Sequence, residues 1–178
     1  IAVVIDLVRK TGCRAHIVHL SSSSALPMLK RAKQDGLPIS AETCPHYLCL
    51  EAEEVPEGAT EYKCAPPIRE SENRALLWHG LINGTIDFVI SDHSPCVPGL
   101  KLVERGDFMG AWGGIASLQV GLPNLWTEAQ GRNVDIEQMS RWMTTGPVSF
   151  LGLTDRGRIA PGYRAALVAW RPEDHFVI

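Results

Sequence analysis

An acidic residue stands where a buried strand is expected to end. Phe88 to Ile90 form a short apolar run typical of a strand buried on both faces, and the polar Ser-Asp-His-Ser-Pro sequence that follows ends it. In a parallel α/β barrel, a carboxylate at the carboxyl end of a strand points into the mouth where the chemistry takes place. Asp92 is therefore the first candidate for a catalytic residue. The alternative is that Asp92 caps the turn that follows it.

Two histidines, His16 and His19, lie on another expected strand. Their positions differ by an odd number, so an extended strand directs the two imidazoles to opposite faces and only one can bind a given metal ion. His19 is closer to the carboxyl end and is the better ligand candidate, whereas we expect His16 to be packed or hydrogen-bonded in the interior. An imidazole and the Asp92 carboxylate suit zinc or a similar divalent ion, but a catalytic zinc needs about three protein ligands and no third is evident.

The other histidines are expected to have lesser roles. His46 follows a strand within a Cys-Pro-His-Tyr sequence, which predicts a rigid turn and a supporting or structural role. His93 adjoins Asp92 and is expected to line the pocket. His79, in an expected helix, and His175, in the tail, are expected at the surface.

The elements that must position these residues alternate as β-α-β units. Strands are expected near 14–20, 38–42 and 87–91, and each is followed by a polar loop that contains His or Asp. A helix over 2–11 is expected to end at Gly12, and the serine run 21–24 is expected to cap the next helix rather than to supply a nucleophile. Further helices are expected over 25–34, from Ser71 to Asn83-Gly84, over 115–129 and over 136–145. The apolar face of the helix that starts at Ser71 is expected to consist of Leu76, Leu77, Leu81 and Ile82.

Three segments depart from this alternation. Residues 48–67, rich in Glu, Pro and Gly, are expected to form a long loop of functional importance. Glycines between 99 and 114 enclose aromatic residues, which predicts a substrate lid; the alternative is a solvent loop with one buried tryptophan. From Gly157 onward a Pro-Gly turn separates two short β-like runs, which predicts a separate β layer.

The composition is that of an ordinary soluble globular protein. The 178 residues are 45% hydrophobic and 21% charged, with a net charge of -3. The 17 Lys and Arg residues are scattered among 20 acidic ones, which argues against nucleic acid as a partner. No apolar run approaches the ~20 residues needed to cross a membrane.

The cysteines indicate a reducing, intracellular compartment, either the cytoplasm or an organelle. Their number, five, is odd, and they lack Cys-x-x-Cys spacing, which argues against a disulfide framework and a zinc knuckle. The chain opens on Ile1 within an expected amphipathic helix, so we expect a fragment whose amino-terminal part is missing.

Six motifs resemble those of the cyclic amidohydrolases, the group that contains allantoinase, dihydropyrimidinase (hydantoinase) and dihydroorotase. They keep the family order and run almost from end to end of the chain. Within the group, the fourth and fifth motifs are most similar to those of allantoinases. The six are His16-Ile-Val-His-Leu-Ser-Ser22, Glu42-Thr-Cys-Pro-His-Tyr-Leu48, Ala65-Pro-Pro-Ile-Arg69, Ser91-Asp-His-Ser-Pro-Cys96, Ala111-Trp-Gly-Gly-Ile-Ala116 and Gly157-Arg-Ile-Ala-Pro-Gly162.

This resemblance implies an α/β fold: a TIM-like (β/α)8 barrel with a small β-sandwich. Residues 1–150 would be the carboxyl-terminal part of the barrel, with about its last three strands, and 151–178 a segment of the β-sandwich. At 164–168 the chain has Arg-Ala-Ala-Leu-Val where the family usually has Asp-Ala-Asp-Leu-Val, which puts the contacts of the β layer in doubt. Because a barrel needs ~200 or more residues and a closed sheet, the 178 residues alone are expected to be inactive.

The resemblance also implies a centre of two divalent ions, expected to be zinc, bridged by hydroxide. The family's ligands are a His-x-His pair, a carboxylated lysine, two further histidines and an aspartate. His19 matches one of these histidines and Asp92 the aspartate, while the other four ligands are expected upstream of Ile1. His46 is not a ligand in this interpretation.

The activity implied is the hydrolysis of allantoin to allantoate, with Asp92 as the group that transfers the proton. His93 and the backbone around Ala65, Trp112, Gly113 and Gly114 are expected to contact the ureide substrate. The alternatives are hydantoinase or dihydroorotase activity and a non-catalytic, hydantoinase-like scaffold that has lost its metals. The presence of both metal-ligand candidates favours an enzyme. The resemblance further implies a homo-oligomer, a tetramer.

Overall fold

Three short parallel strands form the centre of the fold. The computed structural model describes residues 1–175. β1 (Ala15–Ile17), β2 (Ile39–Thr43) and β3 (Phe88–Val89) form one sheet in the order β1-β2-β3. Ala15 of β1 pairs with Ile39 of β2, and Thr43 of β2 pairs with Val89 of β3. Chain order equals sheet order, as in consecutive β/α units. The predicted α/β fold with parallel strands is confirmed.

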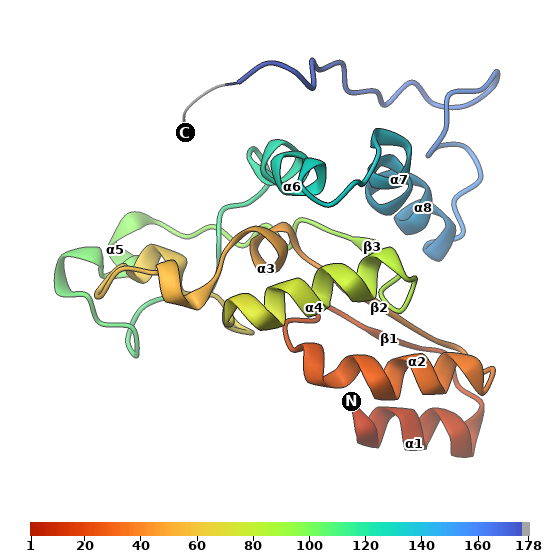
Figure 1. The fold of residues 1–178 in the computed structure, drawn as a ribbon, viewed down its shortest axis with the longest axis horizontal. Coiled ribbons are helices and arrows are strands. Elements are labelled where there is room, and N and C mark those ends of the chain that lie inside the picture. The colour runs from red at the N-terminus through yellow and green to blue at the C-terminus, as the bar shows by residue number, and fades with distance from the viewer. Residues whose placement is uncertain (176–178) are drawn as a thin grey trace.

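Helices α1 (Ala2–Thr11), α2 (Leu26–Gln34) and α4 (Ser71–Ile82) come from the expected segments and lie beside the strands (Figure 1). α1 ends as expected at Gly12, whose φ of 69° is left-handed and whose N–H donates to the carbonyl of Val8 at 2.8 Å.

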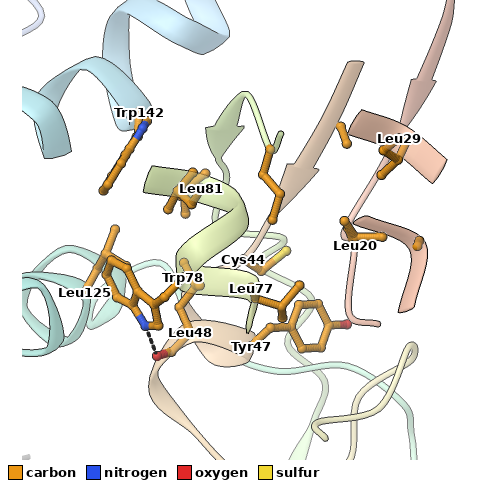
Figure 2. Packing of buried hydrophobic residues seen from close by; sticks show 14 of the residues in the cluster. Leu20, Leu29, Cys44, Tyr47, Leu48, Leu77, Trp78, Leu81, Leu125 and Trp142 are labelled. Carbon is orange, nitrogen blue, oxygen red and sulfur yellow. Dashed lines mark hydrogen bonds between the residues drawn. The ribbon is translucent and has the colours of Figure 1, made fainter. Parts of the chain in front are cut away.

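The buried face of α4 differs from the expected one. Leu77 and Leu81 are buried as expected, but Leu76 and Ile82 are 46% and 43% exposed, and Trp78 is buried in their place. Figure 2 shows the cause: Trp78 lies between Leu48 and Trp142, with its indole N–H donating to the carbonyl of Leu48 at 2.8 Å. This hydrogen bond satisfies the polar atom of an otherwise apolar side chain, so a tryptophan can occupy the core.

The serine run does not cap α2 with its own side chains. A short helix, η1 (Ser23–Ala25), precedes α2, and neither helix has a side-chain cap at its start. Instead, Oδ1 of Asn73 accepts from the N–H of Ser23 at 2.7 Å, and Nδ2 of Asn73 donates to the carbonyl of Ser21 at 2.9 Å. The expected serine cap is therefore wrong, because an amide from α4 bonds these backbone groups.

The connecting segments contain more helix than expected. The predicted loop 48–67 begins within α3 (Pro45–Cys49) and holds η2 (Ala52–Glu54) and η3 (Thr60–Tyr62). The predicted lid contains α5 (Pro98–Lys101) and η4 (Val103–Arg105). The two later helices begin or end differently from the prediction. They are α6 (Gly121–Gln130) and α7 (Ile136–Ser140), the latter continuing through a π-helical turn, η5 (Arg141–Thr145), into α8 (Gly146–Phe150).

The tail beyond α8 runs as an extended trace past α6, α7 and α8 (Figure 1). Residues 151–175 contain turns and irregular backbone but no strand. Trp170 packs edge-on against Trp126 at 5.6 Å between ring centroids, which attaches the tail to α6. The guanidinium of Arg164, where the chain departs from the family pattern, pairs with Asp155. A strand needs a neighbouring strand to hydrogen-bond its backbone, and residues 151–175 have none. The assignment of 151–178 to a β-sandwich therefore stays a prediction. Its last residues, 176–178, lie outside the described part of the chain.

Within residues 1–175, no helix has the length and apolar character that crossing a membrane requires.

Candidate functional site

His19 and Asp92 lie at the same edge of the sheet with the same unusual backbone. His19 follows β1 and Asp92 follows β3, both at carboxyl ends. Their φ angles are 38° and 44°, in the left-handed region that residues other than glycine rarely adopt. Such conformations cost about 1–3 kcal/mol each and concentrate at functional sites. The same backbone turn therefore takes the chain out of both strands at the two predicted metal ligands.

His46, from α3, lies near enough to both residues for their charges to affect its imidazole. It is only 4% exposed, and burial lowers the pKa of its imidazole to about 4, with the Asp92 carboxylate opposing that shift and His19 adding to it. The ring is therefore neutral at pH 7, with a lone pair available. In the described part of the chain, neither ring nitrogen of His46 has a hydrogen-bond partner, and Nδ1 of His19 also lacks one. The structure thus places an unsatisfied imidazole near both His19 and Asp92.

Cys44 joins this group although sequence reasoning missed it. Its thiol sulfur, a ring nitrogen of His46 and a carboxylate oxygen of Asp92 all lie within 4.8 Å of one another. Cys44 is fully buried, and burial raises the pKa of its thiol, with the Asp92 and Glu42 carboxylates adding to the shift. Cys44 directly follows β2, so the rule that identified Asp92, a polar residue at the carboxyl end of a buried strand, would also have found it.

His16 has the interior position predicted for it. Nδ1 lies 2.7 Å from the hydroxyl of Ser40 and Nε2 lies 3.0 Å from the Glu42 carboxylate. Its ring stacks on Phe88 at 5.3 Å and packs against Phe150 at 4.2 Å between centroids. Because both ring nitrogens have partners, His16 is not available to a metal at the other end of the strand.

Two of the predicted substrate-contacting segments meet. A Cβ placed on Gly113 would lie 3.5 Å from the Cβ of Ala65. Among the described residues, neither Ala65 nor Gly113 uses its backbone N–H or C=O in a hydrogen bond within the chain. Trp112, beside Gly113, is 49% exposed, so about half of its side chain is accessible to solvent in the segment predicted to be a lid. The structure therefore leaves adjacent backbone donors and acceptors free on two loops.

Two lysines hold these loops together. Lys101 Nζ donates to the carbonyls of Lys63, at 2.8 Å, and of Gly114. Lys63 Nζ donates to the carbonyls of Met109, at 3.1 Å, and Ala111, at 2.6 Å. The ammonium groups thus connect the segment before Ala65 to residues 109–114; sequence spacing gave no signal for either contact.

His93 also joins two segments. Its Nδ1 accepts from the backbone N–H groups of Ser117 and Leu118, both at 3.1 Å, so this nitrogen carries no proton. The hydroxyl of Ser117 in turn donates to the carbonyl of Ser91 at 2.5 Å. His93 therefore fixes the chain after β3 against residues 115–118, and its contact with a substrate stays a prediction.

The residues at this edge fit a divalent metal ion. Neutral imidazoles without partners, a carboxylate and a thiol are the donors that zinc takes in proteins. An unsatisfied buried polar group costs about 1–3 kcal/mol, which a bound ion would offset. The implied metal is thus compatible with the donors that the chain places here.

The sequence matches the Amidohydrolase family over residues 4–177. It is 46% identical to the allantoinase of Streptomyces avermitilis over 178 residues, all of this chain and 39% of the relative. It is 48% identical to the allantoinase of Arabidopsis thaliana over 166 residues, 93% of this chain and 33% of the relative. The chain therefore spans between a third and two-fifths of the length of these relatives.

Solved hydantoinase structures share the fold. The L-hydantoinase (dihydropyrimidinase) of Arthrobacter aurescens superposes with a TM-score of 0.83 at 27% identity, over 91% of this chain and 36% of the other. The D-hydantoinase (dihydropyrimidinase) of a Thermus species superposes with a TM-score of 0.81 at 32% identity, over 92% of this chain and 37% of the other. With its sequence match, its fold and its metal-compatible donors in agreement, the chain belongs to the amidohydrolase family.

Proposed function

We propose that the full-length protein hydrolyses the cyclic amide of allantoin to allantoate. The observation that carries this proposal is the difference in identity: 46% and 48% to two allantoinases, against 27% and 32% to two hydantoinases of the same fold. Hydantoinase activity is the second candidate, supported by the TM-scores of 0.83 and 0.81. Dihydroorotase activity and a non-catalytic scaffold are the remaining alternatives.

His19 and Asp92 are proposed to hold a centre of two divalent ions, most simply zinc, together with ligands from barrel strands outside these residues. Their position at one edge of the sheet and the unpartnered Nδ1 of His19 support this role. Bound metal lowers the pKa of water and polarises the scissile carbonyl.

Asp92 is proposed as the proton carrier. As the water oxygen bonds to the carbonyl carbon, the carboxylate accepts the proton that water releases. It then donates this proton to the ring nitrogen as the carbon–nitrogen bond breaks, so that the ring opens without a free amide anion. The left-handed backbone at Asp92, with φ of 44°, supports the role because it turns the residue out of β3 toward His46 and Cys44.

The ureide is proposed to bind at the meeting point of the two loops. An allantoin ring presents N–H donors and C=O acceptors, and the free backbone groups of Ala65 and Gly113 offer the complementary pairs. Gly114 lies next along the lid, Trp112 would cover the ring, and His93 would hold the neighbouring segment in place.

The test is turnover by the full-length protein with allantoin, dihydrouracil and dihydroorotate, beside metal analysis of the same sample. We expect hydrolysis of allantoin and much slower reaction with the other two rings. Preference for dihydrouracil or dihydroorotate would replace the proposal with the corresponding activity. Bound metal without turnover of any ring would favour the scaffold. We also expect a homotetramer, which light scattering of the same preparation would measure.

A further inference from the structure

The two prolines that follow Ala65 leave this part of the loop without backbone donors. A proline has no N–H, so Pro66 and Pro67 can form backbone hydrogen bonds only through their carbonyl oxygens. Two side-chain hydroxyls bond these oxygens: Tyr47 donates to the carbonyl of Pro66 and Ser21 donates to that of Pro67, both at 2.7 Å. The loop that carries Ala65 is therefore fixed by side chains 19 and 46 residues away in the chain.

We propose that Tyr47 and Ser21 are positioning residues, which act through Pro66 and Pro67 to set the direction in which the backbone of Ala65 meets the substrate. The inference rests on the proposed function, in which the ureide binds the N–H and C=O of Ala65, groups without a partner among residues 1–175. Each hydroxyl has a single proton, which it donates to a carbonyl, so neither hydroxyl is a donor to the substrate.

The proline rings transmit the constraint to Ala65. Each ring restricts its own φ to about −65°, and a residue that precedes proline is restricted mostly to extended backbone. Few bonds between Ala65 and the two bonded carbonyls can therefore rotate freely. The direction of the Ala65 N–H and C=O follows from the positions of these carbonyls, and hence from the two hydroxyls.

Both donors are fixed in the interior. Tyr47 and Ser21 are each 3% exposed, and the Tyr47 ring belongs to the buried cluster drawn in Figure 2. Burial raises the pKa of the Tyr47 phenol, so the hydroxyl keeps its proton and remains a donor. The Ser21 oxygen accepts from Nε of Arg69 at 3.2 Å, which leaves its own proton for the carbonyl of Pro67. Neither hydroxyl is free to turn away from its carbonyl.

Ser21 also connects the substrate loop to the loop that leaves β1. It stands two residues after His19, and its hydroxyl reaches Pro67, two residues after Ala65. One hydrogen bond thus constrains the separation of the loops that carry His19 and Ala65. A substrate that must contact both loops at once depends on this separation, because misplacement of a reacting group by about 1 Å is costly.

The test is steady-state kinetics of the full-length protein with Tyr47→Phe or Ser21→Ala, each of which removes one hydroxyl and little packing. Loss of one neutral hydrogen bond should raise the KM for allantoin by roughly 2- to 10-fold. kcat and the metal content should stay close to those of the unmodified protein, since substrate binding alone is weakened. The near-ultraviolet dichroism of buried Trp78 checks that each variant is folded. Either variant tests the proposal alone if the other does not fold.

Hydrogen exchange of the same proteins without substrate gives a second measurement, which does not depend on turnover. The amides of Ile68 and Arg69, which follow the two prolines, should exchange faster in both variants. The matched controls are Tyr62→Phe, in η3 of the same loop, and Ser24→Ala, whose exposed hydroxyl lies 2.8 Å from that of Ser22. Both controls should keep the KM and the exchange rates of the unmodified protein.

The outcomes separate this inference from the proposed function. Unchanged exchange in both variants, or an unchanged KM beside normal allantoin turnover, would overturn the inference alone. A fall in kcat or in metal content at an unchanged KM would also overturn it, because the two residues would then act on the reacting centre or on the fold.

Hydrolysis of dihydrouracil or dihydroorotate in place of allantoin would remove the proposed function alone, provided that the KM for that ring rises in both variants at constant kcat. A protein that hydrolyses none of the three rings would remove both the function and the inference.

Discussion

The ammonium group of Lys101 donates a hydrogen bond to the carbonyl of Gly114, 13 residues further along the chain. The same group donates to the carbonyls of Glu61, at 3.2 Å, and Lys63, at 2.8 Å. A lysine has three N–H donors, so all three are used on backbone oxygens. Two loops that the sequence separates are thus joined by one partly buried charge, next to the proposed ureide site.

Replacement of Lys101 by Met should loosen the loop over residues 99–114. Three carbonyls lose a charged donor, and hydrogen bonds to charged groups contribute about 1.5–3 kcal/mol each at most. We expect faster hydrogen exchange of the amides in 109–114, and a KM for allantoin that rises while kcat of the full-length enzyme changes little. Lys10→Met, on the exposed side of α1, is the control and should change neither. Unchanged exchange in 109–114 would contradict the role given to Lys101.

Replacement of Asp92 by Asn should remove the proton carrier. General acid–base groups contribute roughly 10²- to 10⁴-fold, so we expect a loss of at least about 100-fold in kcat for allantoin. Steady-state kinetics of the full-length protein measures it. Near-normal turnover by Asp92→Asn would rule out the proton transfer proposed here.

Replacement of His19 by Ala should lower both activity and metal content, because the variant loses a metal ligand. Metal analysis after dialysis would measure the second effect. His79→Ala, which alters an exposed histidine on α4, is the control and should keep its metal. Full metal occupancy in His19→Ala would exclude His19 as a ligand.

The face of α4 can be tested by unfolding in urea. Trp78→Ala should lower the free energy of unfolding by about 3–5 kcal/mol, because it opens a cavity and leaves the carbonyl of Leu48 unpaired. Leu76→Ala, two residues away, should cost less than about 1 kcal/mol, since Leu76 is largely exposed. Similar losses from the two substitutions would show that the helix packs through a different face.

The cysteines should differ in their reaction with iodoacetamide at pH 8. Cys13 is exposed, whereas Cys44 and Cys64 are buried. Burial raises the pKa of Cys49 to about 12 and that of Cys44 as well, which lowers the thiolate fraction at pH 8, and the thiolate is the reactive form. Mass spectrometry should find Cys13 labelled first, and all five cysteines labelled only in denaturant. Rapid labelling of Cys44 in the folded protein would contradict its burial.

Local patterns predicted most of the helices and the order of the strands. Gly12 ends α1 and Asn83-Gly84 ends α4 because these residues adopt the backbone that a helix terminus needs, whatever surrounds them. The position of Asp92 after a buried strand likewise follows from its immediate neighbours. Such features depend on residues within a few positions of one another, so a single sequence contains them.

Contacts between distant segments decided the rest. Asn73 replaces the serines as the partner of the η1 backbone across 50 residues, and Trp78 enters the core because the Leu48 carbonyl, 30 residues away, accepts its N–H. Cys44 meets Asp92 only because β2 and β3 pair in parallel and place their ends together. The β-like runs after Gly157 show that a local pattern alone does not make a strand. A strand forms only where another strand hydrogen-bonds its backbone, and residues 151–175 have no such neighbour.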